Sequence, residues 1–335
     1  MDSKPSDTQN ATHGIFLEYA RSYRTVLLTD IDSGDRTFRV TTRDDNEDLI
    51  ASIRQVGLIQ PPVLIARSAG YSIVCGFRRI AACRQASLTR ITAGVLGKRT
   101  DRFKAAQVSI ADNAFQRSLN LVETSRALKL LEDFSPDDQQ RITAAAALGL
   151  PTSRSVVADI KRICHLPLQV QEGILTNTID LSMALELGGL DRKDAAELVS
   201  LFEQLKIGLN KQRELLLLTK EIAERDNTTI LKLLTAKSLQ EILKDAEMDG
   251  AVKRQKVRSY FRQRRFPSVT KAEDEYRKRV KQLKLGNHIV LIPPKDFEGN
   301  TFSMTLRFHN RRELDDLKKR LDAMVQHPAL GKILD

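Results

Sequence analysis

The sequence predicts an α+β protein with three folded parts: an α/β domain, an all-α domain, and a small C-terminal unit of two strands and one helix. Its 335 residues exceed one average domain. Hydrophobic residues make up 41% and charged residues 29%, which is typical of a soluble globular chain. Strand and helix patterns alternate to about residue 118, helical patterns follow to about residue 245, and strand patterns return after residue 286.

Several classes of protein are excluded by what the sequence lacks. No apolar run approaches the roughly 18 residues of a membrane-spanning helix, and the N-terminus has no apolar signal core, so we expect a cytoplasmic protein with no membrane contact. Cysteine and histidine spacings match no disulfide or zinc motif, and no GxxxxGK phosphate loop occurs. We expect three reduced, buried thiols: Cys75, Cys83 and Cys164.

The N-terminal α/β domain is predicted over residues 25–118, after a flexible tail at residues 1–24. Its first strand is expected at 25–28. Asn46 is a plausible N-cap for a helix that Gly57 ends, because apolar residues recur on one helical face between them. A hairpin, a helix, a strand and a second helix follow in order, at 62–66 with 71–75, 80–86, 91–96 and 102–113.

The helical domain is predicted over residues 119–245 and contains a candidate helix-turn-helix. An alanine-rich helix at 141–148 and a helix at 153–164 flank a Gly-Leu-Pro-Thr break, and small alanines are expected to let the helices approach closely. Hydroxyls and basic groups at the start of the second helix suit base edges and phosphates. The candidate DNA-binding residues are Ser153, Arg154, Ser155, Lys161 and Arg162. Many plain helical proteins contain such helix pairs, so packing is the alternative.

Most of the excess positive charge lies in a basic helical linker predicted over residues 246–285. The net charge is +11, and residues 253–284 alone hold thirteen Lys or Arg against three acids. A solvated basic face is one explanation. The concentration of charge favours a polyanion partner, and specifically nucleic acid.

The C-terminal unit is predicted over residues 286–335, with strands at 288–292 and 302–308 and a helix at 311–326. Phe302, Met304, Leu306 and Phe308 alternate in the second strand, so one face of the strand is apolar. Two strands and one helix are marginal alone. We therefore expect a homodimer whose partner chain covers the exposed sheet.

Three short segments are candidates for a nucleotide site. Gly76 offers close approach and free amides at a helix start, and Arg78 and Arg79 add forked donors suited to phosphate. A stiff loop carries Gln60 and Pro61. The third segment, residues 112–117, ends a helix with a carboxylate, an amide and an arginine. Together they suit a triphosphate with hydrated Mg²⁺, although each alone is a common surface feature.

Read in order, four segments resemble the signature boxes of the ParB partition family. They are NEDLIASIRQVGLIQPPVLI, GYSIVCGFRRIAACRQASL, IADNAFQRSLNLVE, and SRSVVADIKRICHLPLQVQEGIL, which is similar to the family's helix-turn-helix. The resemblance covers residues 25–190, and the C-terminal third resembles an extension found in part of the family. It implies a sulfiredoxin-like N-terminal domain that binds CTP with Mg²⁺, in a nucleoid-associated dimeric clamp that loads at an inverted-repeat DNA site and slides. A ParA-type ATPase is the implied motor partner.

The resemblance also implies roles for individual residues. Gln60 and Pro61 fall in the nucleotide loop, Gly76, Arg78 and Arg79 bind the triphosphate, and Asn113 holds the metal. Either Gln116 or Arg117 faces the phosphates, because the match has an ambiguous one-residue register there. The sites implied are therefore nucleotide-binding for Gln60, Pro61, Gly76, Arg78, Arg79, Asn113, Gln116 and Arg117, metal-binding for Asn113, and catalytic for Asp112.

The sequence departs from the family pattern where a hydrolytic group would be expected. Phe77 replaces the usual glutamate before the two arginines, and Asp112 stands where the family usually has glutamate. Binding by the arginines need not suffer, but CTP hydrolysis is left open.

Two other functions stay open from the sequence. A nuclease or small-molecule kinase on the same fold would need a poised carboxylate, for which Asp112 and Glu123 are the obvious candidates. A transcriptional regulator would use the same DNA module without segregation.

Overall fold

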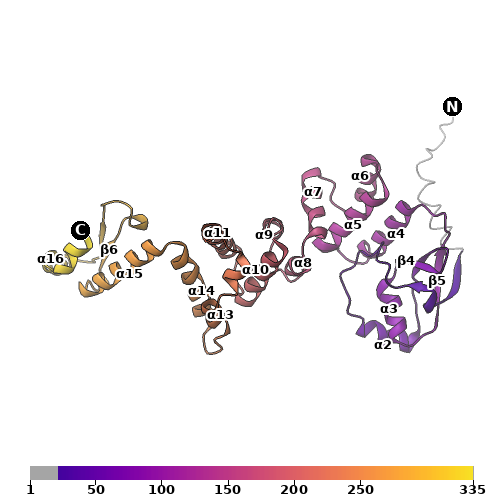
Figure 1. Ribbon diagram of the computed structural model, residues 1–335, viewed down its shortest axis with the longest axis horizontal. Helices are drawn as coiled ribbons and strands as arrows, with labels where there is room; N and C mark the ends of the chain where they lie inside the picture. The colour runs from indigo at the N-terminus through magenta and orange to yellow at the C-terminus, as the bar shows by residue number, and fades with distance from the viewer. Residues whose placement is uncertain (1–21, 335) are drawn as a thin grey trace. The chain divides into compact units, whose positions relative to one another are not determined.

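The computed structural model describes residues 22–334, and the chain divides into two compact units, one up to Ser200 and one from Leu201 (Figure 1). Mixed α and β content is confirmed. The predicted boundaries at residues 118, 245 and 285 stay predictions, and the division at residue 200 falls inside the predicted helical domain. Most of the predicted N-terminal tail lies outside the described residues.

A five-stranded sheet with strand order β1-β5-β3-β4-β2 organises the start of the first unit. The β1–β5 and β3–β4 pairs are antiparallel, whereas β3–β5 and β2–β4 are parallel. The predicted hairpin is therefore present as β3 and β4, with Arg67 donating its backbone N–H to the Gly70 carbonyl across the turn. The strands are β1 (Tyr23–Leu27), β2 (Ile31–Asp32), β3 (Val63–Ala66), β4 (Tyr71–Cys75) and β5 (Arg90–Leu96).

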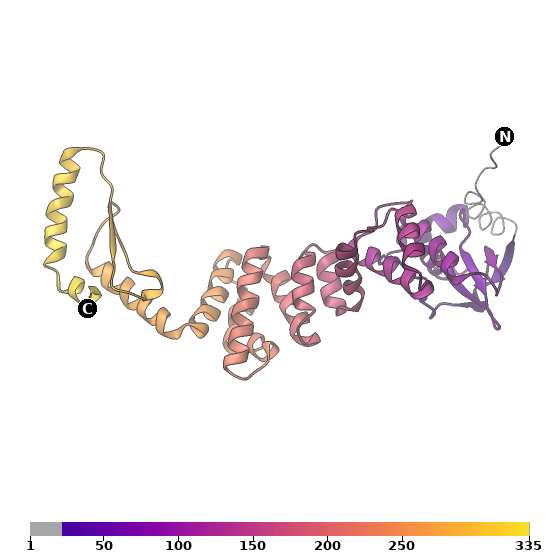
Figure 2. The ribbon, with the colours of Figure 1, turned by 90° about the horizontal axis from the view of Figure 1, so that it is seen from above.

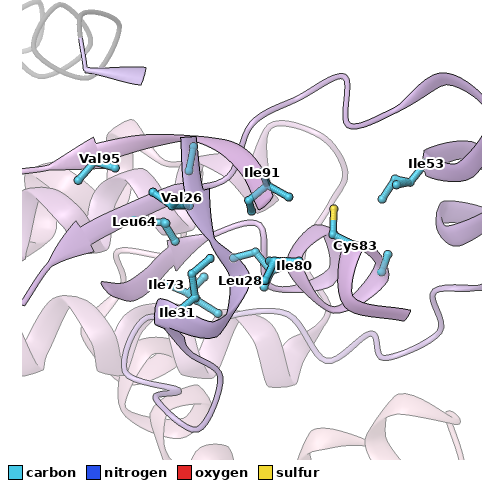
Figure 3. Packing of buried hydrophobic residues seen from close by; sticks show 12 residues of the cluster. Val26, Leu28, Ile31, Ile53, Leu64, Ile73, Ile80, Cys83, Ile91 and Val95 are labelled. Carbon is cyan, nitrogen blue, oxygen red and sulfur yellow. The ribbon is translucent and has the colours of Figure 1, made fainter. Parts of the chain in front are cut away.

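Two helices, α2 (Glu47–Val56) and α3 (Phe77–Gln85), pack against this sheet. Figure 3 shows Ile80 of α3 directed toward Leu28 and Ile73, and all three are almost fully buried. Burying each such side chain contributes roughly 1.5–3 kcal/mol before entropy is counted. This packing fixes where the N-terminus of α3 lies.

The rest of the first unit is helical, as the periodicity predicted. After α4 (Arg102–Ala114), the long helix α5 (Leu121–Phe134) packs against both α4 and α7. The predicted helix pair is present as α6 (Asp138–Ala147) and α7 (Arg154–Arg162). The helices α8 (Leu168–Leu175) and α9 (Leu181–Leu187) complete this unit, and α10 (Arg192–Leu205) carries the chain across its boundary.

The second unit begins with helices, of which α11 is the longest of its first part. Phe261 of α14 and Ile222 of α11 are fully buried. The helices are α11 (Leu209–Arg225), α12 (Ile230–Leu234), α13 (Lys237–Lys244), α14 (Gly250–Arg265) and α15 (Pro267–Gln282).

The C-terminal hairpin packs one of its faces on α15 and the last helices. The antiparallel strands β6 (Ile289–Ile292) and β7 (Ser303–Leu306) precede α16 (Arg311–Val325) and α17 (Pro328–Leu334) (Figure 2). Of the four residues predicted to alternate in the second strand, Phe302 and Leu306 join this core, whereas Met304 and Phe308 stay exposed. The dimerisation surface stays a prediction.

Over residues 22–334, the structure contains no helix with both the length and the apolar character needed to cross a bilayer.

Candidate anion and nucleotide site

The turn from β4 into α3 is built around Gly76. Its φ of 88° places it in the left-handed region, where glycine is favoured. A Cβ at this position would lie 2.7 Å from Cβ of Pro62, so the turn also depends on close contact with the proline loop. The glycine therefore brings the first turn of α3 and the loop of residues 60–62 together, as the nucleotide prediction requires.

Replacing Gly76 with alanine is expected to lower the free energy of unfolding by about 2–3 kcal/mol, because the left-handed backbone and the Pro62 contact both oppose a side chain. Gly149→Ala is the matched control. Gly149 has a φ of 69° and nothing lies within 4 Å of its Cβ position, so a loss of only about 1 kcal/mol is expected. Thermal unfolding of both variants measures the difference, and equal losses would show that the Pro62 contact is unimportant.

Arg79 joins three of the predicted segments. Its guanidinium donates to both carboxylate oxygens of Asp112 at 2.9 and 2.7 Å. It also donates to the carbonyl oxygens of Gln60 and Pro61 at 3.2 and 3.3 Å. The Arg79 and Asp112 side chains are only 12% and 17% exposed, so this ion pair is poorly screened by solvent. In this state Arg79 is held by protein groups.

Arg78 points to the other side of α3, where further arginines surround a small cavity. It donates to the Asp45 carbonyl and, from Nε, to Oδ1 of Asn46 at 3.3 Å. Asn46 lies at the N-cap of α2 as predicted, but its side chain makes no cap bond. The cavity is about 120 Å³, and its lining includes Arg36, Arg39, Arg78 and Arg84. We call these four residues the arginine ring.

The arginine ring carries more positive than negative charge. Asp44 is the one acidic residue in the cavity lining and pairs with Arg39. Arg84 donates to the carbonyls of Leu28 and Ile31, both at 2.7 Å, which holds its charged head in place. The buried Nε of Arg39 has no hydrogen-bond partner in residues 22–334. Such a concentration of guanidinium groups suits an oxyanion.

Sequence reasoning found Arg78 but missed Arg36, Arg39 and Arg84. These residues come from the loop after β2 and from the end of α3, and no short motif links them. Only the packing of α3 on the sheet brings them together.

Phe77 lines the same cavity and packs against the core beside it. A phenylalanine there supplies an apolar wall, and it can neither bind a metal nor activate a water molecule. The carboxylates of Asp44 and Asp112 both pair with arginines, so neither is free to take its place.

The donor set near Asp112 fits Mg²⁺ only when phosphate oxygens supply most of the ligands. Both Asp112 oxygens accept from Arg79, and the Asn113 amide nitrogen donates to the Ser109 carbonyl at 2.9 Å. Gln116 approaches Asp112 at 3.5 Å. Within residues 22–334, no group of three or more His, Cys, Asp or Glu side chains is arranged to hold a metal ion. The Asn113 oxygen is the group that could complete a phosphate-bound ion.

Arg117 lies apart from these groups and pairs with Glu123. Its two terminal nitrogens donate to the two Glu123 oxygens at 2.7 and 2.6 Å. The Glu123 side chain is 0% exposed and also accepts from the backbone N–H of Thr42 at 2.9 Å. We call Arg117, Glu123, Thr42 and Asn120 the carboxylate node. The binding of phosphate by Arg117 stays a prediction.

The carboxylate node lowers the pKa of Glu123. Burial alone would raise it, but the Arg117 side chain and the amides of Thr42 and Asn120 outweigh burial and lower the pKa to about 2. Asn120 and Glu123 also form a capping box at the start of α5. The N-x-x-E spacing is the sequence signal that predicts such a capping box. The carboxylate node therefore connects the loop before α2 to the start of α5.

Two large apolar side chains next to the site are exposed to solvent. Ile59, next to Gln60, is 80% exposed, and Phe115, at the end of α4, is 70% exposed. In contrast, burial raises the pKa of the Cys75 thiol to about 12, with a smaller contribution from the Asp112 carboxylate. Cys75 is therefore no nucleophile.

The predicted DNA-binding residues lie on or beside α7. Ser153, Arg154 and Ser155 are exposed at its start, and the Arg154 side chain has no hydrogen-bond or ion-pair partner in residues 22–334. Lys161 instead pairs with Glu132 at 2.6 Å. Arg162 is exposed. The start of the helix is thus the accessible part of the predicted surface.

Much of the charge in the basic segment is used inside the second unit. Arg258, Arg264 and Arg265 of α14 pair with Glu214, Asp226 and Glu221, which lie in or directly after α11. Within residues 22–334, the basic side chains of this segment that have no hydrogen-bond or ion-pair partner are lysines: Lys256, Lys271, Lys278, Lys281 and Lys284. Any contact of this segment with a polyanion therefore falls mainly to lysines.

Comparison with known proteins shows which family the region around this site resembles. Residues 18–114 match the ParB N-terminal domain. The chain is 32% identical over 193 residues to the chromosome-partitioning protein ParB of Caulobacter vibrioides, covering 56% of this chain and 59% of that protein. It is 29% identical over 153 residues to a probable ParB of Helicobacter pylori, covering 46% and 51%. The matched parts span half to three fifths of these relatives.

A longer match is to the chromosome-partitioning protein Spo0J of Thermus thermophilus, at 28% identity over 211 residues, or 63% of this chain and 75% of that one. Among solved structures, a truncated ParB from Caulobacter crescentus complexed with CTP-gamma-S is 25% identical over 54% of this chain and 98% of that one, with a TM-score of 0.25. Because that TM-score is low, the similarity to the ParB family is argued from the sequence matches alone.

Proposed function

We propose that the chain is a ParB-like partition protein that acts as a dimeric clamp on DNA, with closure that depends on bound CTP. The match of residues 18–114 to the ParB N-terminal domain and the similarity to ParB proteins support this proposal. The observation that carries this proposal is the cluster of guanidinium groups around α3. Arg78 and Arg79 lie in its first turn directly after Gly76, and the other members of the arginine ring line the cavity beside Arg78. A helix N-terminus with several guanidinium groups is suited to bind a polyphosphate.

In this proposal, the triphosphate lies along the first turn of α3. Arg78 and the arginine ring bind its oxygens, and Arg79 exchanges one or more of its bonds to Asp112 for bonds to phosphate. Mg²⁺, when bound, would neutralise phosphate charge, with Asn113 as the protein ligand. The Phe77 ring gives the pocket an apolar wall. We assign nucleotide binding to this site and make no assignment of CTP hydrolysis.

DNA binding is assigned to the α6–α7 pair as a helix-turn-helix. The exposed Ser153, Arg154 and Ser155 would enter the major groove, and a dimer would read two half-sites of an inverted repeat. Lysines of the basic segment would add salt-sensitive contacts with no sequence preference. The C-terminal unit would hold the two chains together through its exposed sheet face, and a ParA-type ATPase would be the motor partner.

Titration of labelled CTP, ATP and GTP into the full chain tests the nucleotide assignment. We expect CTP to bind at least about tenfold more tightly than the purine nucleotides, because selectivity between bases comes from a few hydrogen bonds worth about 1.4 kcal/mol or more in total. Equal binding of all three nucleotides, or no binding of CTP with or without DNA, would contradict the proposal.

A further inference from the structure

A second cavity lies between the two helices of the candidate DNA-binding pair. It has a volume of about 290 Å³ and is lined by residues of α5, α6 and α7 and of the connection between α6 and α7. The alanines of α6, which the sequence suggested would allow close approach, instead leave this space. The connection between the helices runs from Leu148 to Ser153, with Gly149 in the left-handed region.

The floor of this cavity is apolar. Leu128 and Leu131 of α5 form part of it and are otherwise buried, and Ile142, Ala145 and Val157 contribute from the flanking helices. An apolar space of this size does not hold ordered water well, and it suits a compact apolar group of about ten heavy atoms.

The rim of the cavity is charged and has a net positive balance. It contains Arg141, Arg154 and Lys161 against Glu132 and Asp138. Lys161 pairs with Glu132, and Arg141 pairs with Asp138, so both acids have cationic partners. Arg154 is the rim cation whose side chain has no partner in the part of the chain that the structure describes. A ligand that filled the floor would place its head group next to a free guanidinium.

We propose that this cavity binds a small amphipathic carboxylate, with its hydrocarbon part on Leu128 and Leu131 and its carboxylate on Arg154. The apolar floor excludes a fully polar anion, and the free guanidinium favours an anionic head over a neutral or cationic one.

Binding of this ligand would weaken DNA binding, an inference that rests on the proposed function. Arg154 is among the residues assigned to the major groove, so a carboxylate on Arg154 competes with DNA for the same guanidinium. The cavity is thereby an effector site that weakens DNA binding.

Calorimetric titration of the full chain with octanoate, below its micelle concentration, tests the site without DNA. Octanoate is expected to bind at one site per chain, and octylamine at least about tenfold more weakly, because its charge has the wrong sign. Arg154→Gln is expected to weaken octanoate about tenfold while leaving 1-octanol unchanged. Equal affinity for octanoate and octylamine would overturn the assignment of the head group to Arg154.

Cavity-filling variants locate the ligand. Ala145→Leu fills the floor from α6 and is expected to abolish octanoate binding, whereas Ala146→Leu, at an exposed position of the same helix, is the matched control and keeps it. Ile142→Phe fills the cavity independently, should Ala145→Leu fail to fold by thermal unfolding. Octanoate binding that survives in a folded filled variant overturns the proposal.

The effect on DNA is measured separately by fluorescence anisotropy with a duplex. Octanoate is expected to weaken DNA binding several-fold in the wild-type chain and in Ala146→Leu, but not in Ala145→Leu. If octanoate binds and DNA affinity is unchanged, the effector role is overturned while the binding site stands. If the chain binds no duplex even without octanoate, the proposed function fails and the cavity site is judged by calorimetry.

Discussion

Replacing Arg79 with alanine is expected to weaken CTP binding about 30- to 100-fold, through loss of charge-assisted hydrogen bonds worth about 2–3 kcal/mol. Arg79 is the residue that connects α3, the Gln60–Pro61 loop and α4. Its removal also leaves the mostly buried Asp112 carboxylate without a counter-charge. Equilibrium binding of labelled CTP in magnesium-free buffer measures the effect, with circular dichroism to confirm folding.

The matched variant Asp112→Asn is expected to act in the opposite direction. Asp112 holds the Arg79 guanidinium with both oxygens, so it competes with phosphate for the same donors. Removing its charge while keeping its shape frees Arg79, and CTP affinity without Mg²⁺ is expected to be unchanged or higher. Weaker binding in Asp112→Asn together with unaltered binding in Arg79→Ala would contradict the assignment of phosphate contacts to Arg79.

The carboxylate node predicts the second large effect. Glu123→Gln leaves the largely buried Arg117 without its counter-charge, and the free energy of unfolding is expected to fall by about 3 kcal/mol. The control is Asp133→Asn, which breaks the exposed pair between Lys129 and Asp133 and should cost less than about 0.5 kcal/mol. Urea unfolding at neutral pH measures both variants. Equal, small losses would contradict a structural role for the node.

The same carboxylate makes stability depend on pH. The pKa of Glu123 falls from its ordinary 4.5 to about 2 in the folded chain. Its contribution, about 3 kcal/mol, is therefore fully present above pH 4.5 and is lost as the pH falls toward 2. Glu123→Gln should lack this acid-sensitive portion. Identical pH profiles for the wild type and Glu123→Gln between pH 5 and pH 2.5 would show that the pKa of Glu123 is not lowered in the folded chain.

Local patterns predicted most elements of the first unit, because each has a short sequence signal. Gly57 marks the end of one helix and Gly76 the start of another, and the short apolar runs before and after Gly70 give the hairpin. The order of the strands in the sheet was not predicted, since pairing between β1 and β5 joins residues about seventy positions apart.

The candidate site was predicted in part for the same reason. Arg78 and Arg79 were found from a local motif, and Arg79 does meet Gln60, Pro61 and Asp112. The arginine ring was missed because Arg36 and Arg39 come from a loop with no regular pattern. The pairing of Arg117 with Glu123 was missed because ion pairs between oppositely charged neighbours cannot be told from free charges without coordinates.

The basic segment shows a limit of counting charge. Its excess of Lys and Arg predicted a polyanion partner, yet three of its arginines pair with acids in or directly after α11. Those acids lie at least twenty residues away in the sequence, so a count within the segment does not include them. The available charge is smaller than the sequence indicates, and any salt dependence of DNA binding should be correspondingly shallower.

The most direct test of the clamp is crosslinking of two chains near the nucleotide site. A cysteine at Ile59, which is exposed beside Gln60, reports approach of two N-terminal domains, and a cysteine at the exposed Leu217 of α11 is the control. The native Cys75 and Cys83 are buried, so they add little background. Cys164, which was also predicted to be buried, is only partly buried, so it is replaced with serine in both variants. We expect CTP with cognate DNA to raise crosslinking at position 59 several-fold, and to leave position 217 unchanged. Equal crosslinking at position 59 with and without CTP and DNA would contradict nucleotide-dependent closure.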